Sequence, residues 1–148
     1  MKIKKYLKDS PIFSIFDLHQ SLLQTSTPLL KKEGLSFMQS LVLITILLEG
    51  KSVTTPSQLC QALNLSKAGI SHIISNLESK GFLKRMVKEE DARSLKLILT
   101  QPGIRKANKL VKILDLFEKG LEEDLGIQRL SLFLSGLEDF KKCLNSSL

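Results

Sequence analysis

The chain has 148 residues, of which 43% are apolar and 25% are charged, and its formal net charge is +7. This length and composition predict a globular protein with a core of its own and argue against a disordered chain. Cys60, Cys143, His19 and His72 are far apart and form no C-x-x-C pattern. We therefore expect neither a structural metal nor another cofactor.

The N-terminus and the hydropathy of the chain predict a cytoplasmic protein. Asp9, Ser10 and Pro11 fall where a signal peptide requires an apolar stretch. The longest apolar run, LVLITILL at 41–48, is too short to cross a bilayer and is typical of a buried helix. We expect reduced thiols and no membrane partner.

Positive charge is concentrated in the middle of the chain. Residues 51–110 carry eleven lysines and arginines against four acids, whereas residues 111–148 carry five against seven. A basic region of this kind is typical of a protein with a polyanionic partner, although a solvated lysine-rich surface gives the same count.

Two helices are expected before a helix-turn-helix. Residues 12–25 repeat apolar groups at helical spacing, and residues 36–49 are apolar nearly all round, as a central buried helix is, with Gly50 as its stop. Residues 54–81 then carry two short helical patterns joined by about three residues. Their N-caps are Thr55 and Ser66, and their stops are Asn64 and Gly81.

The second of these helices predicts a recognition surface. Its apolar residues at helical spacing must face the core, which leaves small or hydrogen-bonding side chains outside: Lys67, Ser71, His72, Ser75, Asn76 and Ser79. Such groups approach the edge of a DNA groove without steric penalty. A helix that is only structural more often pairs Glu with Lys on its surface, but a plain exposed helix remains the alternative.

A hairpin and two terminal helices complete the pattern. Residues 82–88 and 94–100 are β-type runs joined by a loop of six residues, and acids at 89–91 precede Arg93 at its tip. Thr100 caps a helix over 104–120, and a last helical stretch reaches Leu144. A helix-turn-helix followed by a two-stranded hairpin is a winged helix, and the hairpin is its wing. The first and last helices carry more large apolar residues than a small winged helix covers, so we expect a homodimer in which they bury one another.

Residues 54–103 carry a recognisable set of motifs. The helix-turn-helix is followed by the motif Asp-x-Arg and then by a strand that ends in Leu-Thr-x-x-Gly. The matching residues are Asp91, Arg93, Leu99, Thr100 and Gly103. Together these motifs resemble the MarR family of bacterial winged-helix transcriptional regulators. The resemblance implies a mainly helical single domain over 1–148 with a small β-hairpin wing. Residues 36–103 would form the DNA-binding lobe, and residues 1–35 and 104–148 the dimerisation helices.

The resemblance also implies a function. The chain would be a homodimeric, sequence-specific regulator that binds a pseudo-palindromic double-stranded DNA operator. It would act as a repressor, and a small aromatic ligand would release it from the DNA. His19 is the candidate ligand contact. We expect no metal site and no catalytic site. The DNA-binding candidates are Ser66, Lys67, Ser71, His72, Ser75 and Asn76 for the major groove, Lys84, Arg85, Lys88 and Lys96 for the backbone, and Arg93, oriented by Asp91, for the minor groove.

The sequence departs from the family pattern at a few positions. Ala92 replaces the first of two wing arginines, Gly69 stands where a Thr is common, and His72 and Asn76 stand where basic residues are common. These changes leave the fold prediction intact and bear on operator sequence and affinity.

Two other functions stay open. The winged helix could bind an acidic protein partner instead of DNA, and a thiol-based redox sensor would use Cys60 or Cys143, although neither has an evident activating partner in the sequence. An enzyme is not expected, because the sequence has no Gly-rich phosphate loop, nucleophile elbow or His-Cys-carboxylate cluster.

Overall fold

The computed structural model describes residue 7 and residues 9–50, 54–88 and 91–146, apart from the side chains of residues 88 and 91–94. The chain forms two compact units, Met1–Asn108 and Lys109–Leu148. No helix in the described ranges combines the length and the apolar character that crossing a membrane requires.

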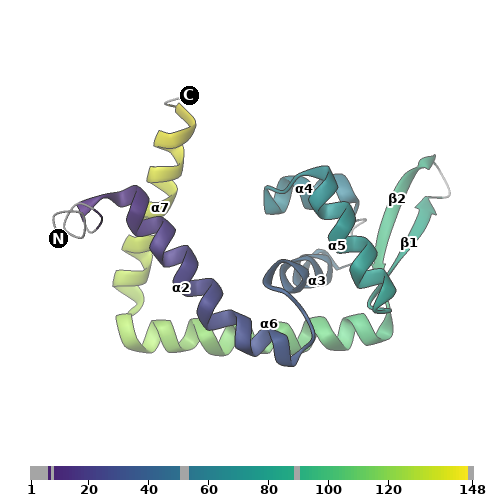
Figure 1. The fold of residues 1–148 in the computed structure, drawn as a ribbon, viewed down its shortest axis with the longest axis horizontal. Helices are drawn as coiled ribbons and strands as arrows, with labels where there is room; N and C mark the ends of the chain where they lie inside the picture. The colour runs from purple at the N-terminus through teal and green to yellow at the C-terminus, as the bar shows by residue number, and fades with distance from the viewer. Residues whose placement is uncertain (1–6, 8, 51–53, 89–90, 147–148) are drawn as a thin grey trace. The chain divides into compact units, whose positions relative to one another are not determined.

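The first unit is a winged helix-turn-helix preceded by a long helix. Its elements, in chain order, are α2 (Pro11–Lys32), α3 (Phe37–Glu49), α4 (Pro56–Leu63), α5 (Lys67–Ser79), β1 (Leu83–Lys88), β2 (Asp91–Leu99) and the beginning of α6 (Gln101–Leu125). Figure 1 shows α3, α4 and α5 gathered beside the hairpin. The second unit holds the rest of α6 and α7 (Ile127–Ser146).

The helix-turn-helix has the caps that the sequence predicts. The Thr55 side chain accepts from the Gln58 backbone N–H at 3.3 Å, and Gln58 Oε1 accepts from the Thr55 N–H at 2.8 Å, which completes a capping box. Ser66 Oγ accepts from the Gly69 N–H at 3.1 Å. Asn64 ends α4 in the left-handed region, with φ of 50°. Local hydrogen bonding therefore fixes the short turn between α4 and α5.

The core lies where α3, α5 and the base of the hairpin meet. Ile70, Ile74 and Leu77 of α5 are buried, as their helical spacing predicts. α3 is buried along one side, but Leu48 near its end is 73% exposed, so it is less enclosed than its apolar composition predicts. The most enclosed apolar side chains of the first unit are Val42, Leu43, Leu59, Ile70, Ile74, Leu77, Leu83, Leu97 and Ala107. Since burial of a Val, Leu or Ile side chain contributes about 1.5–3 kcal/mol, these contacts hold α5 firmly in the lobe.

α2 is longer than the predicted helix over residues 12–25. It continues to Lys32 with Pro28 inside it. The polar cluster before Pro28 resembles a helix end in the sequence, but Leu30 beyond it is buried in the lobe, and that burial favours another turn of helix.

The predicted start of the second strand and the six-residue loop were wrong. β2 begins at Asp91, so only residues 89–90 separate it from β1. Regular antiparallel pairing runs from Leu83 opposite Leu99 to Val87 opposite Leu95, and the register then shifts so that Lys88 pairs with Asp91. Residues 92–94 therefore belong to β2, although they do not continue the alternation of apolar and polar residues by which the sequence marks a strand.

The Thr-x-x-Gly motif joins α6 to the end of α5. The Thr100 backbone N–H donates to the Phe82 carbonyl at 3.0 Å, and Thr100 Oγ1 donates to the Gly81 carbonyl at 2.6 Å. Thr100 Oγ1 also accepts from the Gly103 N–H at 3.1 Å, which caps α6. A Cβ on Gly103 would lie 1.8 Å from the Phe82 carbonyl oxygen, so only glycine fits there.

We predict that Gly103→Ala lowers the free energy of unfolding by about 1–3 kcal/mol, because backbone would have to move to admit the methyl group. Urea denaturation would measure the loss. Gln101→Ala, an exposed position in the same helical turn, is the matched control and should stay within about 0.5 kcal/mol of the wild type. Equal stability of the two variants would contradict the close packing at Gly103.

Candidate nucleic-acid interface

The outer face of α5 is polar and exposed. Burial of Ile70, Ile74 and Leu77 turns the opposite side of the helix outward. The predicted major-groove residues that are exposed there are Ser66, Lys67, Ser71, His72 and Ser75. The structure thus places five of the six predicted side chains on one solvent-facing surface. Their contact with DNA stays a prediction.

Asn76 differs from the other predicted major-groove residues. It is only partly exposed, and its Oδ1 accepts a hydrogen bond of 2.7 Å from Gln39 Nε2 in α3. Gln39 Oε1 in turn accepts from the Ser36 N–H at 2.9 Å in the capping box of α3. The Ser-x-x-Gln spacing of that box is visible in the sequence, but its link to Asn76 is not. Asn76 therefore joins α5 to the start of α3.

Lys80, the C-cap of α5, makes a second link to the same segment. Its Nζ donates to the carbonyl of Gly34 in the turn between α2 and α3. Beside it, Lys106 Nζ of α6 contacts Glu33 Oε2 at 3.0 Å and lies 5.7 Å from the centre of the Phe82 ring. The turn after α2 is thus held by cations from α5 and α6.

The predicted backbone contacts lie on two different faces of the hairpin. Side chains alternate along a strand, and Arg85 is opposite Leu97 on the face toward α5. Lys84, opposite Ile98, and Lys96, opposite Met86, share the other face. Lys84 is exposed and Lys96 is partly exposed.

Arg85 is fastened to α5. Its Nη2 donates to Ser75 Oγ at 2.7 Å, and its Nε lies 3.4 Å from Glu78 Oε2. Its backbone N–H donates to Glu78 Oε1 at 3.3 Å. The sequence does not reveal this pair, because Glu78 and Arg85 belong to different elements.

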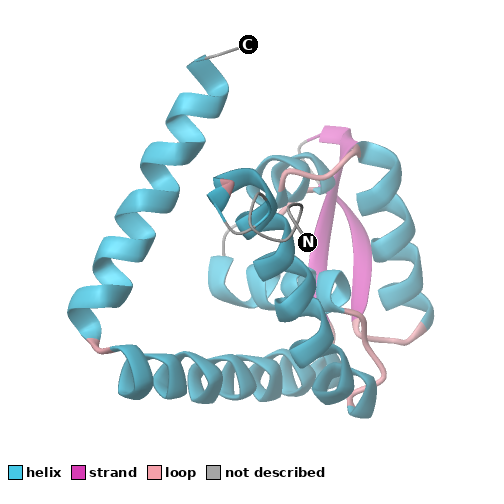
Figure 2. Ribbon diagram, turned by 60° about the vertical axis from the view of Figure 1, so that its left-hand side comes forward, coloured by secondary structure: helices cyan, strands magenta, loops and turns pink. Residues whose placement is uncertain are grey.

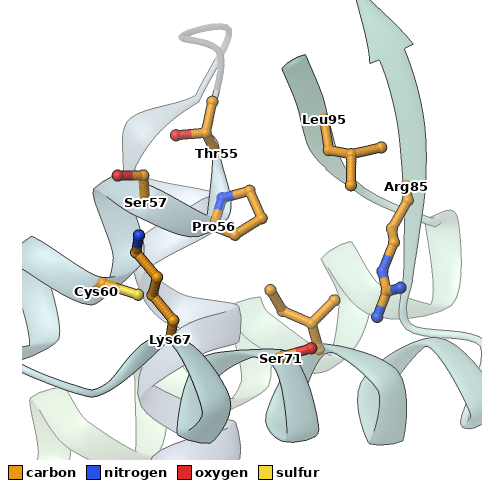
Figure 3. A pocket seen from close by; sticks show the side chains of 9 residues that line it. Thr55, Pro56, Ser57, Cys60, Lys67, Ser71, Arg85 and Leu95 are labelled. Carbon is orange, nitrogen blue, oxygen red and sulfur yellow. The ribbon is translucent and has the colours of Figure 1, made fainter. Parts of the chain in front are cut away.

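A hollow of about 480 Å³ separates the helix-turn-helix from the hairpin. Figure 3 shows side chains reaching it from α4, α5 and both strands. Its polar lining includes Lys67, Arg85, Ser57 and Ser71, and Cys60 also borders it. Lys67 and the hydroxyl groups of Thr55, Ser57 and Ser71 give this surface groups that can bond an anionic neighbour.

The wing tip lies outside what the structure describes at side-chain level. Only the backbone places Lys88, Asp91 and Arg93 there, with Lys88 paired to Asp91 across the hairpin. The prediction that Asp91 orients Arg93 therefore stays a prediction. Figure 2 shows the two strands that lead to this tip, drawn in magenta.

The candidates for ligand, metal and redox chemistry are dispersed. His19 is exposed on α2 and does not line the hollow of about 560 Å³ beside the turn between α2 and α3. Cys60 is partly buried and Cys143 is exposed. Among the described residues, no three His, Cys, Asp or Glu side chains are grouped as metal ligands would be.

Comparison with known proteins agrees with this geometry. Residues 33–94 match the family model described as the MarR family. The HTH-type transcriptional regulator SarZ of Staphylococcus haemolyticus is 27% identical over 67% of this chain and 66% of its own length. The transcriptional repressor MprA of Escherichia coli is 30% identical over 58% of this chain and 49% of its own. The chain thus spans less than two thirds of either relative.

Solved structures show the same fold at low sequence identity. The S. aureus MepR–DNA complex has a TM-score of 0.85 and 19% identity, over 93% of this chain and 98% of that one. The transcriptional regulator SlyA has a TM-score of 0.80 and 16% identity, over 93% and 96%.

The helix-turn-helix followed by a two-stranded hairpin defines a winged helix-turn-helix protein. Together with the matched segment, which covers α3, α4, α5 and β1, it makes this chain similar to members of the MarR family.

We predict that Gln39 and Asn76 are energetically coupled by about 0.5–1.5 kcal/mol, the net value of one hydrogen bond. A double-mutant cycle with Gln39→Ala and Asn76→Ala, measured by urea denaturation, tests this. The control cycle pairs Gln39→Ala with His72→Ala, whose side chain is exposed on the same helix. A coupling no larger than in the control cycle would refute the link between α3 and α5.

Proposed function

We propose that this protein is a homodimeric, sequence-specific double-stranded DNA-binding transcriptional regulator, and that it represses its operator until a small aromatic ligand binds. The observation that carries the proposal is the exposed polar face of α5 beside a basic hairpin. The alternative is a winged helix that docks an acidic protein.

The DNA-binding part of the proposal is supported by side-chain chemistry and by relatives. Ser71, His72 and Ser75 offer hydrogen-bonding groups to base edges in the major groove, and Lys67 offers charge to a phosphate. Arg93 would enter the adjacent minor groove, where a narrow groove attracts cations. MepR, which has the same fold, was solved in complex with DNA.

The homodimer is supported by apolar surface in both units. No side chain of α7 is buried. The large apolar side chains exposed on α2 include Ile12, Phe13, Ile15, Phe16, Leu18, Leu22 and Leu29, and those of the second unit include Leu116, Leu121, Leu125, Ile127, Leu132, Phe133, Leu134 and Leu144. Surface of this kind marks an interface. A second copy would present the same residues in return, and its two-fold symmetry would match a pseudo-palindromic operator.

The ligand response is supported by the hollow beside the turn between α2 and α3. Leu23, Leu35, Phe37 and Met38 give it an apolar lining, while Lys31 and Lys80 add positive charge. This chemistry suits a small aromatic acid. An occupant would touch Lys80, the C-cap of α5. Since α5 is the proposed recognition helix, this contact would alter DNA affinity. His19 stays a predicted ligand contact at a separate position.

Duplex binding and its salt dependence test the DNA-binding proposal. Selection from random duplex DNA should yield pseudo-palindromic sites, and the logarithm of affinity should fall linearly with the logarithm of salt concentration, by about 0.9 for each phosphate contacted. An electrophoretic or fluorescence titration would measure it. No duplex binding at low salt would favour the protein-docking alternative.

We predict that Arg93→Ala weakens operator binding by about 1–3 kcal/mol, because a minor-groove contact is lost, while the melting temperature and the dimer stay almost unchanged. Titration at fixed salt measures the effect. The adjacent Ala92→Gly, which removes only a methyl group, serves as the control for disturbance of the hairpin tip. If Arg93→Ala binds with wild-type affinity, Arg93 does not contact DNA.

We predict that Leu134→Glu shifts the protein from dimer to monomer, since the side chain is 63% exposed in one chain and a charge there would be buried in a dimer. Sedimentation velocity over a concentration series would show the shift. Ser135→Glu introduces the same charge at the next, exposed position and is the control. A wild-type protein that sediments as a monomer would overturn the proposed assembly.

A further inference from the structure

The contact between Arg85 and α5 points to a role other than the one its charge predicts. A basic residue at the base of a wing would normally be assigned to a DNA phosphate. Here the guanidinium donates to Ser75 Oγ at 2.7 Å and lies 3.4 Å from Glu78 Oε2, while the Arg85 N–H donates to Glu78 Oε1 at 3.3 Å. Both the side chain and the backbone of this residue are bonded to the recognition helix.

We propose that Arg85 is a positioning residue that fixes the wing relative to the recognition helix, and that it does not contact a DNA phosphate. This inference rests on the proposed function and refines its DNA interface. Glu78 compensates the charge of Arg85, and the contacts to Ser75 and Glu78 hold the guanidinium against α5.

The position of Arg85 along the hairpin explains why such a contact is needed. At the base, Leu83 and Leu97 are 1% and 2% exposed and anchor the strands in the core. Farther out, Val87 is 57% exposed and Leu95 is 42% exposed, so apolar packing no longer holds the hairpin. Arg85 is opposite Leu97, where the buried base ends and the exposed part of the hairpin begins. It therefore sets the angle at which the outer hairpin leaves the lobe.

That angle determines whether α5 and the wing fit adjacent grooves together. A hairpin held in the bound orientation loses less conformational freedom when DNA binds. The contact is partly exposed, at 34% for Arg85 and 39% for Glu78, so it contributes little to folding stability. Its removal should therefore affect DNA binding more than the fold.

The test compares Arg85→Ala, Glu78→Gln and the double variant with the wild type, in full-length protein on the selected duplex over a range of salt. We expect Arg85→Ala to weaken binding by between about twofold and thirtyfold, Glu78→Gln to weaken it less because the bond to Ser75 remains, and the double variant to match Arg85→Ala, as loss of one shared contact does. Since the proposal assigns no phosphate to Arg85, the double variant should keep the salt slope of the wild type.

Glu78→Gln separates the two roles by the sign of its effect. If Arg85 contacted a phosphate, removing Glu78 would release it and tighten binding, whereas loss of a positioning contact weakens binding even at a salt concentration that screens distant charges. Tighter binding by Glu78→Gln, or a slope in the double variant lower by about 0.9 than that of the wild type, would overturn the proposal.

Lys84→Ala is the matched control. Lys84 precedes Arg85 on β1, is exposed, and makes no hydrogen bond or ion pair within the described part of the chain. If it contacts a phosphate, its loss lowers the salt slope by about 0.9, which establishes that the assay detects a single contact. An unaffected Arg85→Ala would refute the role.

Wild-type binding reports on the proposed function, and the variants report on Arg85. If the wild type binds no duplex, both proposals fall. If the wild type binds and all Arg85 and Glu78 variants bind equally well, only the positioning role falls. Thermal unfolding of each variant confirms that binding is compared between folded proteins.

Discussion

The structure of the lobe depends on one constraint, which is that α5 must be buried on one side and polar on the other. Ile70, Ile74 and Leu77 are at most 1% exposed, and they hold the helix against α3 and the hairpin. Because these residues recur every three or four positions, they lie on one side of the 13-residue helix, and the opposite side is directed outward. The same packing that stabilises the lobe therefore also presents the surface assigned to DNA. A change that loosens the core would disturb this surface as well.

Contacts around α5 are distributed along its length. Ser66 caps its beginning, Ser75 and Glu78 hold the hairpin, Asn76 reaches α3, and Lys80 reaches the turn after α2. Each of these is a single polar contact of modest energy. Their number matters more than their individual strength, since together they couple the recognition helix to three neighbouring elements. A ligand or partner that moved any of these elements would change the orientation of α5.

The sequence predicted the local features well because they depend on neighbouring residues. The caps at Thr55 and Ser66, the left-handed stop at Asn64 and the buried stripe of α5 follow from spacing and side-chain type. The hairpin start at Asp91 was missed because its register shift leaves no alternation to recognise. The pairs Glu78–Arg85 and Gln39–Asn76 were missed for another reason. They join separate elements, and only the packed lobe brings their partners together.

The absence of any buried side chain in α7 has a consequence for how the protein behaves as a population. A helix gains most of its stability by burying an apolar face, and one copy of the described second unit provides nothing to bury that face of α7. Under the proposed assembly, the ordering of this unit obeys mass action, so its structured fraction rises with the amount of protein present. A cell that makes few copies would then hold a regulator that is less stable as well as less abundant, and such chains are the preferred substrates of proteases.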